Sequence, residues 1–231
     1  TGNYEIISSL VTRKQARYQS KPVQQVTPQI QGKRMDQQQP TIQQIALEHA
    51  PERDDYEMQD VHQLRVGLAA GAQCAIIANQ LVSDADLDGL DALLHQHPQA
   101  RVWFLVDSLA QLDALADWGA RRKNARCWDV LLELGIAGYR TGCRTHEQAL
   151  ALAQAIAASP IASLGGVECY EGGLGRCDSA HDIEAVSALV RSVQALVQQI
   201  DAQGLWGGDE VLLSAGGSAV FDLVIPMLKT Q

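Results

Sequence analysis

Short apolar runs alternate with longer stretches rich in alanine and leucine from about residue 62 onward. The runs are apolar at nearly every position, which predicts strands covered on both faces, and the intervening stretches have the composition of helices. The predicted strands are 74–79, 102–107, 128–134, 165–170 and 211–214. The predicted helices are 83–95, 109–118, 146–157 and 183–203, the first capped by Ser83. This alternation favours an α/β fold with a parallel sheet, either a barrel or a doubly wound sheet.

The first sixty residues lack this pattern. Residues 15–44 are rich in glutamine, contain Pro22, Pro28 and Pro40, and show a sustained period of neither 2 nor 3.6. Residues 50–60 are dense in charge and look solvated. We therefore expect a divergent or weakly structured segment over 1–60, followed by one α/β domain over 61–231.

Polar residues or glycines follow several predicted strands, as at Asn79-Gln80, Asp107-Ser108 and Tyr170-Glu171-Gly172. Ligands bind at the carboxyl ends of the strands in both candidate architectures, so these positions are the expected site. Asp107 could support an active-site base, although a plain helix N-cap by Ser108 or Asp107 is the simpler interpretation.

A Gly-Gly-Ser turn follows the last predicted strand and precedes a helical pattern that begins near Ala219. Backbone N–H groups of Gly216, Gly217 and Ser218 could converge on a phosphate, because glycine permits close approach and the helix N-terminus favours an anion. The alternative is a plain turn in which the glycines supply positive φ. The late position of the turn suits the phosphate site of a barrel.

Two further segments could contact a ligand. The loop 135–144 (GIAGYRTGCR) offers two arginines and a threonine to an anion or a planar ring, or it is a solvated loop whose arginines pair with carboxylates. Tyr170 and Glu171 end a strand, where either could hydrogen-bond a ring nitrogen or hydroxyl. Tyr170 could equally be a packed tyrosine with a wet tip.

Composition and charge narrow the range of partners. The formal net charge is −9 at pH 7, so phosphate backbones and anionic lipid are repelled, and we expect neither nucleic-acid nor membrane partners. No run of about 18 apolar residues and no secretion signal is evident, which predicts a cytoplasmic protein. Five cysteines without a CxxC pair are expected to be reduced thiols, and the histidines show no metal-ligand spacing, so no metal site is predicted.

Five segments together resemble the N-terminal barrel of fold-type III pyridoxal-phosphate enzymes. They are ANQLVS (78–83), WFLVDS (103–108), LLELGIAGYRTGCR (131–144), GVECYEG (166–172) and LLSAGGSAVFDLV (212–224). The nearest group is the D-serine deaminase or amino acid deaminase family, with D-threonine aldolase and, more distantly, alanine racemase as relatives. The resemblance covers about residues 61–224.

The resemblance implies a (β/α)₈ barrel that holds pyridoxal 5'-phosphate at its mouth. Phosphate contacts would come from Ser214, Gly216, Gly217 and Ser218. Tyr170 would lie by the pyridine ring, and Arg140 and Thr141 near the ring or its substituents. Such enzymes need a lysine that forms a Schiff base with the cofactor. Lys33, in the chain's single Gly-Lys pair, is the candidate.

The sequence departs from the family pattern in two places. Lys33 lacks the preceding histidine and following threonine of the family motif, and the apolar strand expected before it is absent. The chain stops at Gln231, so we expect an incomplete barrel without the last strand and without the β-rich second domain. That domain carries the His-x-Cys metal pair in the relatives, and no such pair occurs here.

The activity implied by the resemblance is deamination of D-serine or a related D-hydroxyamino acid, with a homodimer as a further expectation. Two alternatives within the same family are a D-threonine aldolase-type lyase and a non-catalytic or fragmentary barrel. A third alternative is a doubly wound nucleotide-binding protein, which would need a GxGxxG motif near its first strand. The sequence contains no such motif.

Overall fold

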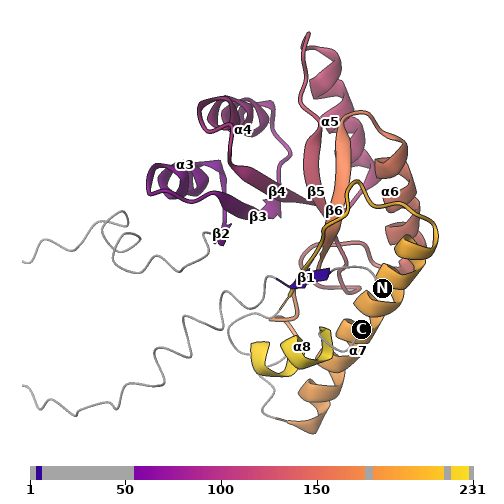
Figure 1. Ribbon diagram of the computed structural model, residues 1–231. Helices are drawn as coiled ribbons and strands as arrows, with labels where there is room; N and C mark the ends of the chain where they lie inside the picture. Colours follow the sequence, from indigo (N-terminus) through magenta and orange to yellow (C-terminus); the bar gives the residue numbers. More distant parts are fainter. Residues whose placement is uncertain (1–3, 7–54, 175–178, 216–219, 229–231) are drawn as a thin grey trace, which may run out of the picture.

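The computed structural model describes residues 4–6, 55–174, 179–215 and 220–228. Seven strands form one sheet in the order β1-β7-β6-β5-β4-β3-β2, and each neighbouring pair is parallel (Figure 1). The strands are β1 (Tyr4–Ile6), β2 (Asp55–Met58), β3 (Cys74–Gln80), β4 (Arg101–Val106), β5 (Trp128–Glu133), β6 (Ala162–Glu168) and β7 (Val211–Ser214). β1 and β2 stand at opposite ends of this order, so the described part of the chain forms an open, curled sheet and an incomplete β/α barrel.

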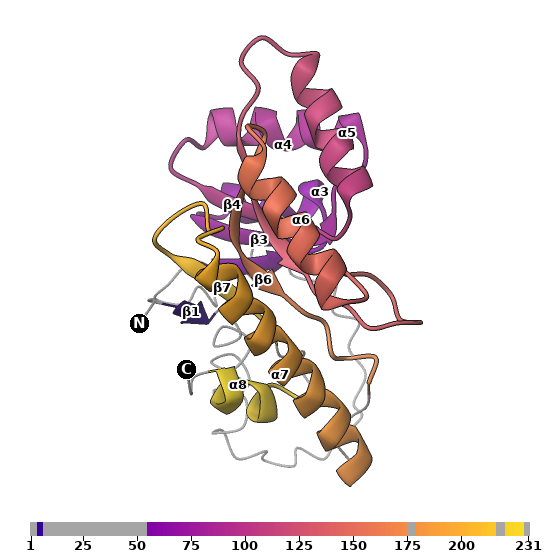
Figure 2. The same ribbon diagram turned by 90° about the vertical axis from the view of Figure 1, so that its right-hand side faces the viewer.

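Helices connect the consecutive strands from β2 to β7 and cover the outer face of the sheet. They are α3 (Val61–Ala69), α4 (Asp84–Gln96), α5 (Leu109–Ala120), α6 (His146–Ala158), α7 (Ala180–Ala202) and, after β7, α8 (Phe221–Leu228). Figure 2 shows α6 and α7 side by side, with α8 against α7. The Gln194 side chain fastens this last pair by donating from Nε2 to the Met227 carbonyl at 2.7 Å.

Serine or threonine caps four of these helices at positions that follow strand ends or loops. In each case the hydroxyl accepts a hydrogen bond from the backbone N–H three residues later. The caps are Ser83, Ser108, Thr145 and Ser179. Such a cap contributes about 1 kcal/mol to stability. The predicted cap at Ser83 is confirmed, and Ser108 caps α5 as the simpler interpretation required.

The two faces of the sheet differ in what they bury. The outer face and the helices share the main core, whose largest fully buried side chains include Trp118, Trp128 and Phe104. The Trp128 ring lies 5.1 Å from that of Trp118 and 5.9 Å from that of Phe104, between ring centroids. The inner face has a small apolar cluster of its own, formed by Ile76, Trp103, Leu105, Leu131 and Leu212 with Cys74 packed against it.

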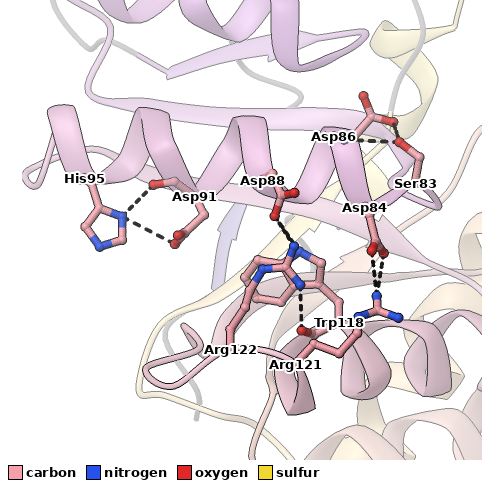
Figure 3. A network of polar contacts seen from close by, with 9 residues as sticks. All are labelled: Ser83, Asp84, Asp86, Asp88, Asp91, His95, Trp118, Arg121 and Arg122. Carbon is pink, nitrogen blue, oxygen red and sulfur yellow. Dashed lines mark hydrogen bonds and ion pairs between the residues drawn. The ribbon is translucent and has the colours of Figure 1, made fainter.

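A polar network on the surface ties α4 to α5 (Figure 3). Arg121 donates to both carboxylate oxygens of Asp84 at 2.7 Å. Asp88 accepts from Trp118 Nε1 at 3.1 Å and pairs with Arg122, whose guanidinium stacks over the Trp118 ring at 4.1 Å. These contacts stabilise the helix pair and lie away from the strand ends.

Within residues 1–60 the structure describes two short strands, and residues 1–3 and 7–54 lie outside the described ranges. Tyr4–Ile6 forms β1 and pairs with β7, while Asp55–Met58 forms β2 and pairs with β3. Among the described strands β2 has one neighbour, and an edge position of this kind tolerates charged residues such as the exposed Glu57. The helix after β2 begins at Val61, where the Asp60 side chain accepts from Gln63 N. None of the helices in the described ranges is long and apolar enough to cross a membrane.

Candidate functional site

Three buried polar residues form a row across the carboxyl ends of adjacent strands. Glu133 ends β5, Glu168 ends β6 and Ser214 ends β7; Glu133 is paired in register with Glu168, and Glu168 with Ser214. Glu133 and Ser214 lie two residues beyond Leu131 and Leu212 of the inner apolar cluster, and Glu168 lies two residues beyond Gly166, which pairs with both leucines. Because side chains alternate along a strand, the row faces the inside of the curled sheet.

The Glu133 carboxylate accepts hydrogen bonds from side chains of two other segments. The Thr141 hydroxyl donates to Glu133 Oε1 at 2.5 Å, and the Gln80 amide donates to Glu133 Oε2. The same Gln80 nitrogen lies 3.3 Å from Oδ2 of Asp107, which follows β4. Burial raises the pKa of Glu133, the two hydrogen bonds oppose that effect, and the charge of Asp107 adds to it. The net direction of the pKa is upward.

The loop 134–145 is folded tightly enough to bring Thr141 to Glu133. Gly142 has a φ of 92° and donates its N–H to Asp107 Oδ2 at 3.1 Å. Cys143 N donates to the Glu133 carbonyl at 2.8 Å, and Gly135 N donates to the Cys143 carbonyl at 2.9 Å. A side chain on Gly142 would run into the backbone of Gly135. Glycine at position 142 is therefore required by both the positive φ and the close approach.

The two arginines of this loop have different surroundings. Arg144 donates to four carbonyl oxygens of the same loop, at distances from 2.7 to 3.2 Å. Arg144 therefore stabilises the conformation of the loop. Arg140 donates to the Asn79 side chain at the end of β3, and its guanidinium lies 5.9 Å from the centroid of the Tyr170 ring. Arg140 is the arginine that reaches across the mouth of the curled sheet.

Tyr170 and Ser214 lie at the same end of the sheet. Cys169 N donates to the Ser214 carbonyl at 3.0 Å, so the segment after β6 runs alongside the end of β7. The Tyr170 side chain is half exposed, whereas Glu171 is buried. Arg140, Thr141, Tyr170 and Ser214 are thus gathered at the carboxyl ends of the strands. Gly216, Gly217, Ser218 and Lys33 lie outside the described residues.

Glu168 has the most unusual environment of this group. Its residue is 5% exposed, and Oε2 has no hydrogen-bond partner among the described residues. Burial raises the pKa of Glu168 well above its ordinary value, and the charges of Glu133, Glu57 and Glu171 raise it further against a smaller opposing effect of Arg140. The raised pKa favours the protonated form of the Glu168 carboxyl, which can donate a hydrogen bond.

The sequence pattern predicted the positions at this end of the sheet, Gln80 among them, but not Glu133 and Glu168 as site residues. The available signal was that Glu133 and Glu168 are charged residues within otherwise apolar predicted strands. Their proximity depends on strand register, which the sequence pattern does not supply. Within the described ranges, no group of three or more histidine, cysteine, aspartate or glutamate side chains is arranged to hold a metal ion.

Comparison with known proteins gives two kinds of likeness, and no family model matches the chain. The 3-hydroxy-D-aspartate aldolase of Paracoccus denitrificans is 26% identical over 148 residues, which are 64% of this chain and 37% of that protein. The crystal structure of D-threonine aldolase from Filomicrobium marinum superposes with a TM-score of 0.53 at 21% identity, over 71% of this chain and 47% of that one. The chain is therefore similar in sequence to part of the first protein and shares the barrel fold of the second.

The chain also superposes on an alanine racemase-like protein from Idiomarina loihiensis. The TM-score is 0.52 at 16% identity, over 75% of this chain and 49% of that one. The chain spans less than half the length of each of these three proteins. The resemblance inferred from the sequence motifs is confirmed, and so is the incomplete barrel fold. Two of the three proteins are named as aldolases, whereas the sequence motifs alone pointed first to a deaminase.

Proposed function

We propose that this chain binds pyridoxal 5'-phosphate at the carboxyl ends of its strands and that it derives from the aldolase branch of the fold-type III barrels. The main support is that Arg140, Tyr170 and Ser214 lie at one end of the sheet, on segments that resemble the cofactor-binding segments of this family. The names of two relatives favour cleavage of a Cα–Cβ bond over deamination.

The residues present fit the cofactor chemically. Ser214, one residue before the glycine-rich turn, places a hydroxyl group where a phosphate would approach the end of β7. Arg140 supplies a positive charge, and the half-exposed Tyr170 ring offers a flat face at the mouth. The neutral form of Glu168 offers a proton donor on the inner face. When bound, pyridoxal phosphate would supply an electron sink for a bond broken at Cα.

The test of cofactor binding uses the chain's few lysines. After incubation with pyridoxal phosphate and reduction with borohydride, peptide mass spectrometry identifies any lysine that formed a Schiff base. We expect the label on Lys33. Lys123 is the one lysine within the described residues, and it is exposed between α5 and β5, at the opposite end of the strands. Lys123→Ala should keep the label and Lys33→Ala should lose it; labelling of Lys123 alone would refute the proposal.

Arg140 gives a second test of cofactor binding. Loss of a charged hydrogen-bond donor removes about 1.5–3 kcal/mol, so Arg140→Ala should weaken pyridoxal-phosphate binding roughly tenfold to a hundredfold. The matched control is Arg191→Ala, because Arg191 pairs with Glu184 on the exposed side of α7. Absorbance titration measures both affinities. Equal affinity in the Arg140 and Arg191 variants would show that Arg140 does not contact the cofactor.

The reaction itself can be distinguished by its products. Cleavage of the Cα–Cβ bond of 3-hydroxy-D-aspartate releases glycine and glyoxylate, whereas dehydration followed by hydrolysis of the resulting imine releases oxaloacetate and ammonia, with no net change in water. We expect glycine and glyoxylate from the chain loaded with pyridoxal phosphate. Ammonia and oxaloacetate would favour the deaminase alternative. Binding of the cofactor without either product would favour the non-catalytic barrel.

A further inference from the structure

The end of the sheet that carries the site is rich in carboxyl groups. The charges of Asp107 and Arg140 act on Glu133, and those of Glu57, Glu133, Glu171 and Arg140 act on Glu168, so the carboxyl residues involved are Glu57, Asp107, Glu133, Glu168 and Glu171. We refer to these five carboxyl residues as the acidic group. They come from four strands or their ends, β2, β4, β5 and β6, so the fold collects them and they are not a local charged run. Arg140 is the single cation among the groups named.

One atom of the acidic group lacks the partner that a buried polar atom normally has. Glu168 Oε2 is inaccessible to solvent and has no hydrogen-bond partner among the described residues, in contrast to Glu133, both of whose oxygens accept hydrogen bonds. An unsatisfied buried carboxyl oxygen costs about 1–3 kcal/mol, and more when it is charged. Such a group is stabilised by any ligand that brings hydrogen-bond donors and positive charge.

We propose that the acidic group binds a primary ammonium ion directly through Glu168, without pyridoxal phosphate. A primary ammonium has three N–H donors and one positive charge. It can therefore donate a hydrogen bond to Glu168 Oε2 and offset the negative charge of the acidic group. A metal ion suits the site less well, because the described acidic side chains are not gathered into a set of three or more that could coordinate one. Within the acidic group, Glu57 is exposed, whereas Glu133, Glu168 and Glu171 are buried.

Binding should be coupled to proton release. Burial and the neighbouring carboxylates raise the pKa of Glu168, so both favour its protonated form. When an ammonium ion R–NH₃⁺ approaches, its charge favours the carboxylate, and the Glu168 proton leaves to the buffer. The ammonium keeps its own three protons, so the step exchanges one proton for one cation. The groups that set this exchange are the other four acidic residues and Arg140.

Calorimetric titration of the full chain with ethylammonium chloride at pH 7 tests this proposal. Titrations in phosphate and in HEPES, which differ in ionisation enthalpy, reveal protons released on binding. We expect saturable binding with up to one proton released per ion. Tetramethylammonium has the charge but no N–H donor, and it should bind at least about tenfold more weakly. Equal binding of the two ions, binding of neither, or preferential binding of Mg²⁺ would overturn the proposal.

The decisive variant is Glu168→Gln, which keeps the shape and removes the charge. It should weaken ethylammonium binding at least about tenfold and abolish the buffer dependence of the heat. Glu184→Gln, which removes an exposed carboxylate of α7, is the control and should change neither. Glu168→Asp keeps the carboxyl and should keep the buffer dependence, which separates a lost charge from a disturbed fold. Unchanged binding in Glu168→Gln would refute the assignment.

These experiments contain no pyridoxal phosphate, so their outcome is independent of the cofactor proposal. Lysine labelling by pyridoxal phosphate without ethylammonium binding would leave the cofactor proposal intact and remove this one. Ethylammonium binding without lysine labelling would support the ammonium proposal and remove the cofactor proposal.

Discussion

The buried carboxyl of Glu168 should make the stability of this protein depend on pH in a direction opposite to that of an ordinary ion-paired carboxylate. In the unfolded chain a glutamate ionises near pH 4.3, whereas in the folded chain burial keeps Glu168 protonated to a much higher pH. Between these two pKa values the folded state holds one proton more than the unfolded state. Stability therefore falls by about 1.4 kcal/mol for each pH unit in that window.

Glu168→Gln removes this penalty because glutamine is neutral at every pH. The difference in unfolding free energy between the variant and the wild type should be smallest near pH 4 and should grow in favour of the variant by about 1.4 kcal/mol per pH unit above pH 5. The difference should level off at the folded pKa of Glu168. Comparing the two proteins cancels most of the contributions of Glu57 and Glu133, which are present in both.

Urea unfolding followed by tryptophan fluorescence at pH 5, 6, 7 and 8 measures this difference. Glu184→Gln is the control, because an exposed carboxylate contributes little that changes over this range. A difference between Glu168→Gln and wild type that stays constant from pH 5 to 8 would show that Glu168 is ionised in the folded protein. The account of the buried carboxyl would then be wrong.

Three other properties can be tested on the same protein. Trp128→Ala should lower the unfolding free energy by about 3–5 kcal/mol in urea melts, because the ring is fully buried; a loss below about 1 kcal/mol would contradict that packing. Gly142→Ala should lower the unfolding free energy more than Gly138→Ala does, because both glycines have a positive φ but only a side chain at position 142 would meet neighbouring backbone atoms. Equal urea midpoints of the two variants would contradict the loop geometry. Maleimide labelling at pH 8, mapped by mass spectrometry, should modify the exposed Cys127 before Cys143, because the Cys143 thiol is buried and its pKa is raised to about 12. Equal labelling rates would indicate that the loop 134–145 opens.

The strands that the sequence predicts well are those buried on both faces. Residues 102–107 and 128–134 are apolar almost throughout, and the structure places β4 and β5 within one residue of them at each end. The helices were located with similar success because serine caps mark their beginnings, as at Ser83 and Ser108. In both cases the signal is local, so a short window of sequence contains it.

The edge strands and the acidic group were not predictable in the same way. β2 reads DYEM, and such a polar segment becomes a strand only because β3 offers it a hydrogen-bonding edge. The proximity of Glu133 to Glu168 follows from the register of β5 on β6, which depends on the whole sheet. The composition of the loop that carries Arg140 and Thr141 predicted it as a ligand-binding loop. The sequence does not show that Arg140 contacts Asn79 of β3 whereas Arg144 bonds carbonyl groups of its own loop, because those contacts depend on the folded conformation.

The pairing of β1 with β7 joins Tyr4 to Val211, near opposite ends of the chain. On the ribosome, the strands from β2 to β7 can assemble in the order in which they emerge, because each lies beside the strand made just before it. β1 is synthesised first, yet it can find its place only after β7 has been made. Among the described strands, the docking of β1 therefore comes after the synthesis of β7, and without β7 the edge of β6 would be open to pairing with a second molecule.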